Sequence, residues 1–120
     1  MAVASYRELE AWRVAMDLVE QIYRVTACFP DGERFGLSNQ LRRAAVSVPS
    51  NIAEGQGRRL PKQFALFLRI ARGSVQEVET QLLIALRLGL VAKEQLDPVL
   101  NTCGSTGRLI VGLLRSIELG

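Results

Sequence analysis

Apolar side chains recur at spacings of three and four residues along most of the chain, which is the pattern of amphipathic α-helices. Four helical segments follow from it, over about residues 5–29, 37–53 and 61–88 and from about residues 92–94 to the end of the chain. No stretch of alternating apolar and polar residues stands beside them. We therefore predict a helix content above about 70%, more than twice that of ordinary domains.

The first segment carries two neighbouring apolar stripes. Ser5 and Glu8 have the spacing of a capping box and are expected to open the helix, and Pro30 to Gly32 are expected to end it. The first stripe consists of Leu9, Trp12, Met16, Val19 and Tyr23, and the second of Ala11, Ala15, Leu18, Ile22, Val25 and Phe29. One stripe is enough to face one core, so this helix is either central in the fold or also contacts another subunit. Val25 serves as the candidate contact residue of the second stripe.

The second segment contains a proline within its helical pattern. Leu37, Leu41, Ala44, Val48 and Ile52 form its apolar line after a connection at residues 33–36, and Pro49 interrupts it. Because proline removes one backbone hydrogen bond and crowds the preceding turn, we expect a kinked helix. Two shorter helices that break at Pro49 are the alternative.

Glycines and prolines mark the remaining helix ends. Gly55 and Gly57 predict a flexible corner, and Pro61 suits the first turn of the third helix. Gly89 is expected just after the end of that helix. The apolar residues of the third and fourth helices are Phe64, Leu68, Ala71, Val75, Val78, Leu82 and Ala85, followed by Leu96, Leu100, Cys103, Gly107, Ile110, Leu114 and Ile117. The small residues Gly104, Ser105 and Gly107 suggest close approach of a neighbouring helix.

Short connections make consecutive helices antiparallel neighbours. The predicted fold is therefore an all-α, up-down-up-down four-helix bundle with a kinked second helix. Its length of 120 residues is that of one domain, spanning 1–120.

Positive charge is concentrated in the middle third of the chain. The net charge is +3, but residues 34–72 carry eight cations against one acid. The candidate cations are Arg42, Arg43, Arg58, Arg59, Lys62, Arg69 and Arg72. If the second and third helices are antiparallel, the pairs Arg42–Arg43 and Arg69–Arg72 could come level and form a phosphate-binding stripe. The alternative is a solvated face whose arginines pair with acids of the same chain or of a neighbouring subunit.

The sequence lacks the residues that most catalytic and metal sites need. There is no histidine, and the two cysteines, Cys28 and Cys103, are far apart in the chain. Glycine-rich phosphate loops are absent as well. We expect no enzyme, no metal ion, no cofactor and no disulfide, and we take both cysteines as small apolar core residues.

A short polar stretch lies within the apolar line of the second segment. It contains Ser47, Ser50, Asn51 and Glu54. One interpretation is structural, with these side chains satisfying backbone groups that Pro49 leaves without partners. The other is a small-ligand site between helices, which would also be where an enzyme or small-molecule binder would act.

No apolar run is long enough to cross a bilayer. The early acids Glu8 and Glu10 do not fit a signal peptide. We therefore expect a cytoplasmic protein without a membrane partner.

Long ordered strings of the chain resemble one protein family. Leu9 to Trp12 with Ala15, the stretch FGLSNQLRRAAVSVPSNIAEGQGRR at residues 35–59, and FALFLRIARGSVQEVETQLLIALRLGL at residues 64–90 carry the likeness. Together they resemble the bacterial four-helix-bundle (S23-like) family named for the 23S ribosomal RNA intervening sequence.

The resemblance implies a four-helix bundle that assembles as a ring-shaped homopentamer. It also implies a distant similarity to the accessory proteins of diversity-generating retroelements, which are basic pentameric bundles that bind nucleic acid and a reverse transcriptase. Two hypotheses follow. The first is a cytoplasmic homopentamer whose central arginines contact RNA or DNA; the alternative is a protein-interaction scaffold whose arginines form salt bridges between subunits. A ring requires two different contact surfaces on each chain, and we expect the first or the fourth helix to supply one.

Overall fold

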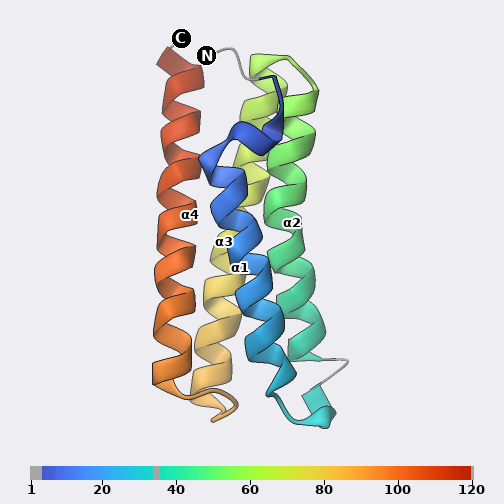
Figure 1. Cartoon of the computed structure of the whole chain (residues 1–120), viewed down its shortest axis with the longest axis vertical. Helices are drawn as coiled ribbons and strands as arrows, with labels where there is room; N and C mark the ends of the chain where they lie inside the picture. Colours follow the sequence, from blue (N-terminus) through green and yellow to red (C-terminus); the bar gives the residue numbers. More distant parts are fainter. Residues whose placement is uncertain (1–3, 34–35, 120) are drawn as a thin grey trace.

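Four long helices run alternately down and up in the computed structural model, which describes residues 4–33 and 36–119 (Figure 1). They are α1 (Glu10–Ala27), α2 (Leu37–Gly57), α3 (Pro61–Arg87) and α4 (Lys93–Leu119). Together they hold 93 of the 120 residues, and the described residues contain no strand. The prediction of an all-α, up-down-up-down four-helix bundle is confirmed. Residues 34 and 35 of the expected connection lie outside the described residues.

The bundle is elongated, with extents of 46 × 23 × 19 Å. Both ends of the chain lie at one end of the bundle, together with the corner between α2 and α3, as Figure 1 shows. At each end of the long axis, residues that are far apart in the sequence therefore lie close together.

The second apolar stripe of α1 faces the core. Ala15, Leu18 and Ile22 are fully buried, whereas Met16 and Tyr23 of the first stripe are 40% and 44% exposed. The apolar lines predicted for the other helices also lie in or against the core, except at Gly107 of α4, where the neighbouring Thr106 is the buried residue. Val25 packs partly buried against that core, so it is not an outward residue.

The capping box opens a different element from the one expected. Ser5 and Glu8 cap a short 3-10 helix, Tyr6–Glu8, in which Ser5 Oγ accepts from the Arg7 amide. Leu9 then adopts an extended conformation, and α1 begins at Glu10. The expectation that Ser5 starts the long helix is therefore wrong, because one extended residue separates the two helical turns. An edge-to-face contact between Tyr6 and Trp12 holds the short helix against α1.

Pro49 lies inside one continuous helix. α2 runs from Leu37 to Gly57 with Pro49 buried in it, so the alternative of two shorter helices is wrong. Asn51 Nδ2 donates to the carbonyl oxygen of Ser47 at 2.8 Å, just before the proline. This contact lies beside Pro49, but the carbonyl that loses its helical partner to the proline is that of Ala45, four residues earlier. The structural interpretation therefore stays a prediction.

Gly55 is a packing residue and not part of a flexible corner. It is buried within α2, and a Cβ atom added to it would lie 2.7 Å from the Cβ of Phe67 on α3. The turn falls later, at Arg59, whose φ of 62° lies in the left-handed region. The absence of a side chain at Gly55 therefore lets α2 and α3 approach closely just before the chain reverses.

Candidate functional site

The seven predicted cations occupy three separate places. Arg42 lies at the contact between α1 and α2, where its Nε donates to Thr26 Oγ1 at 2.8 Å and its guanidinium stands 4.6 Å from the ring centre of Tyr23. Both contacts tie α2 to α1, so Arg42 has a structural role. The neighbouring Arg43 is exposed and has no hydrogen bond or ion pair within the described residues.

The second place is the corner between α2 and α3. Arg58 pairs with Glu54 at 2.7 Å on the exposed surface, and Arg59 donates to the carbonyl oxygen of Ala4 at 3.1 Å. Lys62 is exposed and forms no described contact. Because exposed ion pairs contribute little free energy, these cations remain available to an anionic partner.

The third place is the side of α3 that faces α4. Arg69 pairs with Glu118 of α4 at 2.9 Å, with both side chains 57% exposed. Arg72 lies one turn further along α3 and has no partner among residues 4–33 and 36–119. Both side chains are therefore directed toward α4 and not toward the surface of α2.

The pairs Arg42–Arg43 and Arg69–Arg72 do not lie at the same height along the bundle axis. The hydroxyls of Ser47 and Ser74 lie 2.8 Å apart and mark matching heights on α2 and α3. Arg42 precedes Ser47 by five positions and Arg72 precedes Ser74 by two, and in antiparallel helices these steps lead in opposite directions. At a rise of 1.5 Å per residue, the two arginines are separated by roughly 10 Å along the bundle axis. No single stripe joins them.

Cations nevertheless gather at one end of the bundle. In the halves of α2, α3 and α4 nearest the chain ends, residues 48–74 and 106–119 carry seven cations and two acids. The opposite halves, residues 36–47 and 75–105, carry four of each. Residues 4–18 add two cations and three acids to the first end, and residues 19–33 add one cation and three acids to the other. The end that holds both termini is therefore basic, and the other is slightly acidic.

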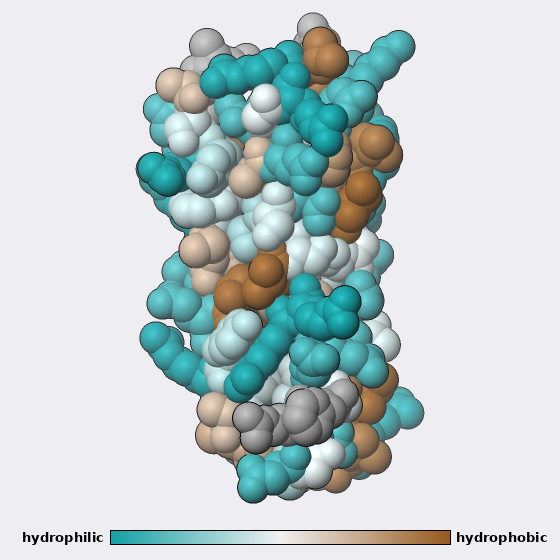
Figure 2. Space-filling model, turned by 90° about the vertical axis from the view of Figure 1, so that its right-hand side faces the viewer, coloured by the Kyte–Doolittle hydropathy of each residue, from teal (hydrophilic) through white to brown (hydrophobic). Residues whose placement is uncertain are grey.

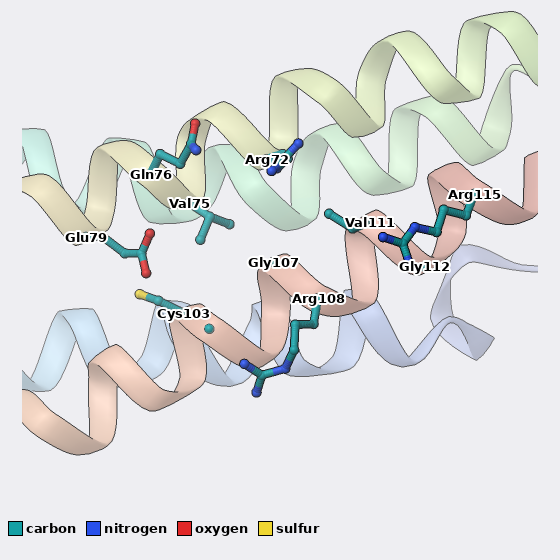
Figure 3. Close-up of a pocket in the computed structure, with 11 residues that line it drawn as sticks. Arg72, Val75, Gln76, Glu79, Cys103, Gly107, Arg108, Val111, Gly112 and Arg115 are labelled. Carbon is teal, nitrogen blue, oxygen red and sulfur yellow. The ribbon is translucent and has the colours of Figure 1, made fainter. Parts of the chain in front are cut away.

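A groove between α3 and α4 brings together three of these arginines. Its volume is about 500 Å³, and Figure 3 shows Arg72 on one wall with Arg108 and Arg115 on the other. The remaining lining residues are Val75, Gln76, Glu79, Cys103, Gly104, Gly107, Val111 and Gly112. Sequence reasoning missed Arg108 and Arg115, because the acids of residues 77–97 outweigh them in that third of the chain. Their spacing of seven residues, which repeats on one helix face, could have revealed them.

The glycines of α4 do not serve the helix contact expected from sequence. A Cβ atom added to Gly107 or Gly112 would meet nothing within 4 Å, and one added to Gly104 would touch only the side chain of Arg108. Close packing inside this chain therefore does not require them. Their effect is to leave the groove open.

Nothing in the groove provides a nucleophile. Burial, with a smaller effect of the Glu79 carboxylate, raises the pKa of the Cys103 thiol from 9.0 to about 12. Almost none of it is a thiolate at neutral pH, and the thiolate is the reactive form. Cys28 is exposed just after the end of α1, away from the groove, so the expectation that it is a core residue is wrong.

The four residues of the polar stretch do not converge on one site. Asn51 donates to the Ser47 hydroxyl, which in turn lies within hydrogen-bond distance of the Ser74 hydroxyl, so these residues form a part-buried structural contact between α2 and α3. Ser50 is exposed, and Glu54 faces Arg58. Across the described ranges, no three histidine, cysteine, aspartate or glutamate side chains are placed to hold a metal ion.

The helices of the described residues were also compared with the length and hydropathy of membrane spans. None of α1 to α4 is both long and apolar enough to cross a bilayer.

Comparison with known proteins identified one family and one fold. The family model described as 23S rRNA-intervening sequence protein matches residues 7–112. A crystal structure of a protein of unknown function from the S23 ribosomal protein family of Bacteroides thetaiotaomicron superposes with a TM-score of 0.81 at 20% identity. That match covers 87% of this chain and 97% of the other. No curated protein matches the chain.

Proposed function

We propose that the chain, which belongs to the 23S rRNA-intervening sequence protein family, is a non-enzymatic homo-oligomer of four-helix bundles that binds RNA or DNA in the cytoplasm. The observation that carries this proposal is the basic end of the bundle, where residues 48–74 and 106–119 carry seven cations and only two acids. Each chain forms one domain over residues 1–120. The nucleic acid contacts the arginine-rich surface at the end that holds both chain termini.

Arginine suits this role because its guanidinium donates in the plane of a phosphate and stays charged at any physiological pH. Lys62 and Arg72 have no partner within the described residues, and the pairs Arg58–Glu54 and Arg69–Glu118 are exposed. A phosphate can replace a carboxylate in such a pair without exposing a buried charge. The interface therefore needs little rearrangement of the fold.

Exposed apolar side chains support the oligomeric part of the proposal. Met16 and Tyr23 on α1, and Leu66, Ile70 and Leu83 on α3, are each at least 40% exposed. Figure 2, which views the side formed by α2, shows apolar side chains gathered at mid-height and along one edge between polar ones. Contiguous apolar surface on a small protein is typical of contact sites. The family resemblance adds the number of subunits, a ring of five with two different contact surfaces on each chain.

The absence of histidine from the sequence and the high pKa of Cys103 support a non-enzymatic role. General acid–base catalysis most often uses histidine, and nucleophilic catalysis by cysteine requires the thiolate.

The test is a binding titration of RNA and DNA at two salt concentrations, with the assembly state measured by light scattering. Binding that weakens steeply between about 50 and 200 mM salt is expected, because phosphate contacts release counterions. No detectable binding at the lower salt concentration would overturn the nucleic-acid proposal. A monomer at micromolar concentration would overturn the assembly.

The alternative is a protein-interaction scaffold whose arginines form salt bridges between subunits. One observation favours it: Glu10, Asp17 and Glu20 on α1 are exposed and have no ion pair in the described part of the chain. Glu10 and Asp17 are seven residues apart, which is also the spacing of Arg108 and Arg115. Reversing Arg108 and Arg115 to Glu would break the assembly under this alternative, and reversing Glu10 and Asp17 to Arg in the same chain would restore it.

A further inference from the structure

The groove between α3 and α4 is lined on the α4 side partly by residues without side chains. It holds about 500 Å³, which is within the range of ligand-binding sites. Three glycines of α4 line it, and two of them have no neighbour that would exclude a side chain. A glycine inside a helix costs about 1 kcal/mol relative to alanine. Alanine would favour the helix at these positions, and no packing contact inside this chain requires glycine at Gly107 or Gly112. The effect of the glycines is therefore to keep the groove open.

The charge of the groove is uneven along its length. Figure 3 shows the side chains of Arg72 and Arg115 near one end and the Glu79 carboxylate beside Cys103 at the other. Arg72 and Arg115 have no partner within the described residues, and Arg108 donates only to Ser105 Oγ at 3.3 Å. An anionic group is therefore attracted to the arginine end and repelled from the Glu79 end.

The floor between these ends is apolar. Val75 of α3 and Val111 of α4 line it, together with the thiol of Cys103, which burial keeps protonated. A flat, uncharged group can lie on such a floor while an attached anion reaches the arginines. A nucleotide has both parts, a base and a phosphate.

We propose that the α3–α4 groove binds one nucleotide of a single-stranded nucleic acid, with its phosphate between Arg72 and Arg115 and its base on Val75 and Val111. This inference rests on the proposed function and names the place of contact. A single strand fits better than a duplex, because its bases are free to leave the stack and meet the apolar floor. No aromatic side chain lines the groove, so little preference for sequence is expected.

A strand also explains why the basic surface continues beyond the groove. Arg69 and Lys62 follow Arg72 along α3 toward the chain ends, and Arg58 and Arg59 lie at the corner beyond them. A free phosphorylated metabolite would use only the groove. Successive phosphates of a strand can contact both the groove and the corner.

The experiment measures fluorescence anisotropy of labelled single strands of about 12 nucleotides, in RNA and DNA form, and of the matching duplex. The groove variant is Arg72→Gln with Arg115→Gln. Its matched control is Arg24→Gln with Arg87→Gln, which removes two exposed arginines from the opposite end of the bundle. The groove variant is expected to lose about tenfold in affinity and to reduce the salt slope by about 1.4, the value for two lost contacts to a single strand. The control is expected to change affinity less than about twofold, because it keeps both contacts.

A second variant tests the floor without changing any charge. Gly107→Leu places a branched aliphatic side chain in the groove, at a position where an added Cβ atom would meet nothing within 4 Å. It is expected to weaken single-strand binding as strongly as the arginine variant does. Thermal unfolding, monitored by circular dichroism, checks that every variant is folded.

The outcomes separate the two proposals. If the unmodified protein binds neither RNA nor DNA, the proposed function fails. If it binds but the groove variants match the control, and Arg58→Gln with Arg59→Gln abolishes binding, then the function stands and the groove inference fails. Equal affinity for the duplex would overturn the inference as well. Displacement of the strand by an acidic peptide of equal charge, with the same dependence on Arg72 and Arg115, would identify the groove as a peptide site and overturn it.

Discussion

The Ser47 hydroxyl of α2 lies 2.8 Å from the Ser74 hydroxyl of α3, at the contact between the two helices. Ser47 Oγ also accepts from Asn51 Nδ2 at 2.9 Å, so three polar side chains share one network in an otherwise apolar contact. Such a network has one satisfied arrangement, and sliding either helix by one turn would leave its groups without partners. It therefore fixes the relative height of α2 and α3, and with it the positions of the arginines.

Removing the Ser74 hydroxyl is expected to destabilise the bundle. Ser74 is 7% exposed, and Ser74→Ala deletes its hydrogen bond to Ser47. The expected loss in the free energy of unfolding is about 1 kcal/mol, measured by urea denaturation. Ser50→Ala, at an exposed position of α2, is the control and should leave stability nearly unchanged. Equal effects of the two substitutions would contradict a role for the network.

Alanine substitutions at Gly55 and Gly107 should change the free energy of unfolding in opposite directions. At Gly55 the new Cβ would lie 2.7 Å from that of Phe67, so Gly55→Ala forces α2 and α3 apart. A loss of about 1–3 kcal/mol is expected, the range for an overpacked core. At Gly107 the new Cβ meets nothing within 4 Å, so Gly107→Ala is expected to gain up to about 1 kcal/mol from helix propensity. Thermal melting of the two variants side by side checks the difference in sign.

Arg42 is expected to contribute to the stability of the fold, whereas its neighbour Arg43 is expected to contribute little. Arg42→Gln removes the hydrogen bond to Thr26 and the contact with the Tyr23 ring, at a cost of about 1–2 kcal/mol. Arg43→Gln has the same change in charge and loses no described contact. Chemical denaturation of both variants provides the comparison. If Arg43→Gln proves as destabilising as Arg42→Gln, net charge and not the contact explains the effect.

The two cysteines should differ in reactivity. Cys28 is exposed and Cys103 is buried with a pKa of about 12, so a thiol reagent at about pH 8 is expected to label Cys28 first and Cys103 only after unfolding. The raised pKa also has a consequence for stability. The thiol is neutral in the folded state, so its contribution is complete below pH 9.0 and is lost as the pH rises toward about 12. Cys103→Ala should flatten the fall in stability over that range, as followed by denaturation at several pH values.

A charge on the exposed stripe of α1 should open the assembly. Met16→Glu places a carboxylate on a side chain that is 40% exposed in the single chain, so the bundle can accept it. Buried without a partner between subunits, the same charge costs several kcal/mol. Light scattering is expected to show smaller particles, and circular dichroism is expected to show an unchanged helix content. Val25→Glu is the contrasting variant, because Val25 packs against the core and its charge should unfold the chain itself. An assembly of unchanged mass for Met16→Glu would exclude this stripe as a contact surface.

The sequence by itself determined the helices and most of the core. Spacings of three and four residues predicted α2, α3 and α4 and most of their buried residues, for example Leu68, Val75 and Leu82 on α3. Proline at the start of α3 and Gly89, with its φ of +73°, after its end were also identified correctly. These features are local, because periodicity and backbone dihedral preferences depend only on neighbouring residues.

The tertiary structure alone decided which neighbour each helix face meets. Both stripes of α1 have helical spacing, and only the packing shows that Leu18 and Ile22 are buried while Met16 and Tyr23 are not. Gly55 and Gly107 are equally small, yet one lies against Phe67 and the other faces an open groove. The same holds for the candidate site, where α3–α4 packing brings Arg72 together with Arg108 and Arg115. Spacing along one helix places a residue on a face, but only the register and direction of the neighbouring helix determine what lies opposite it.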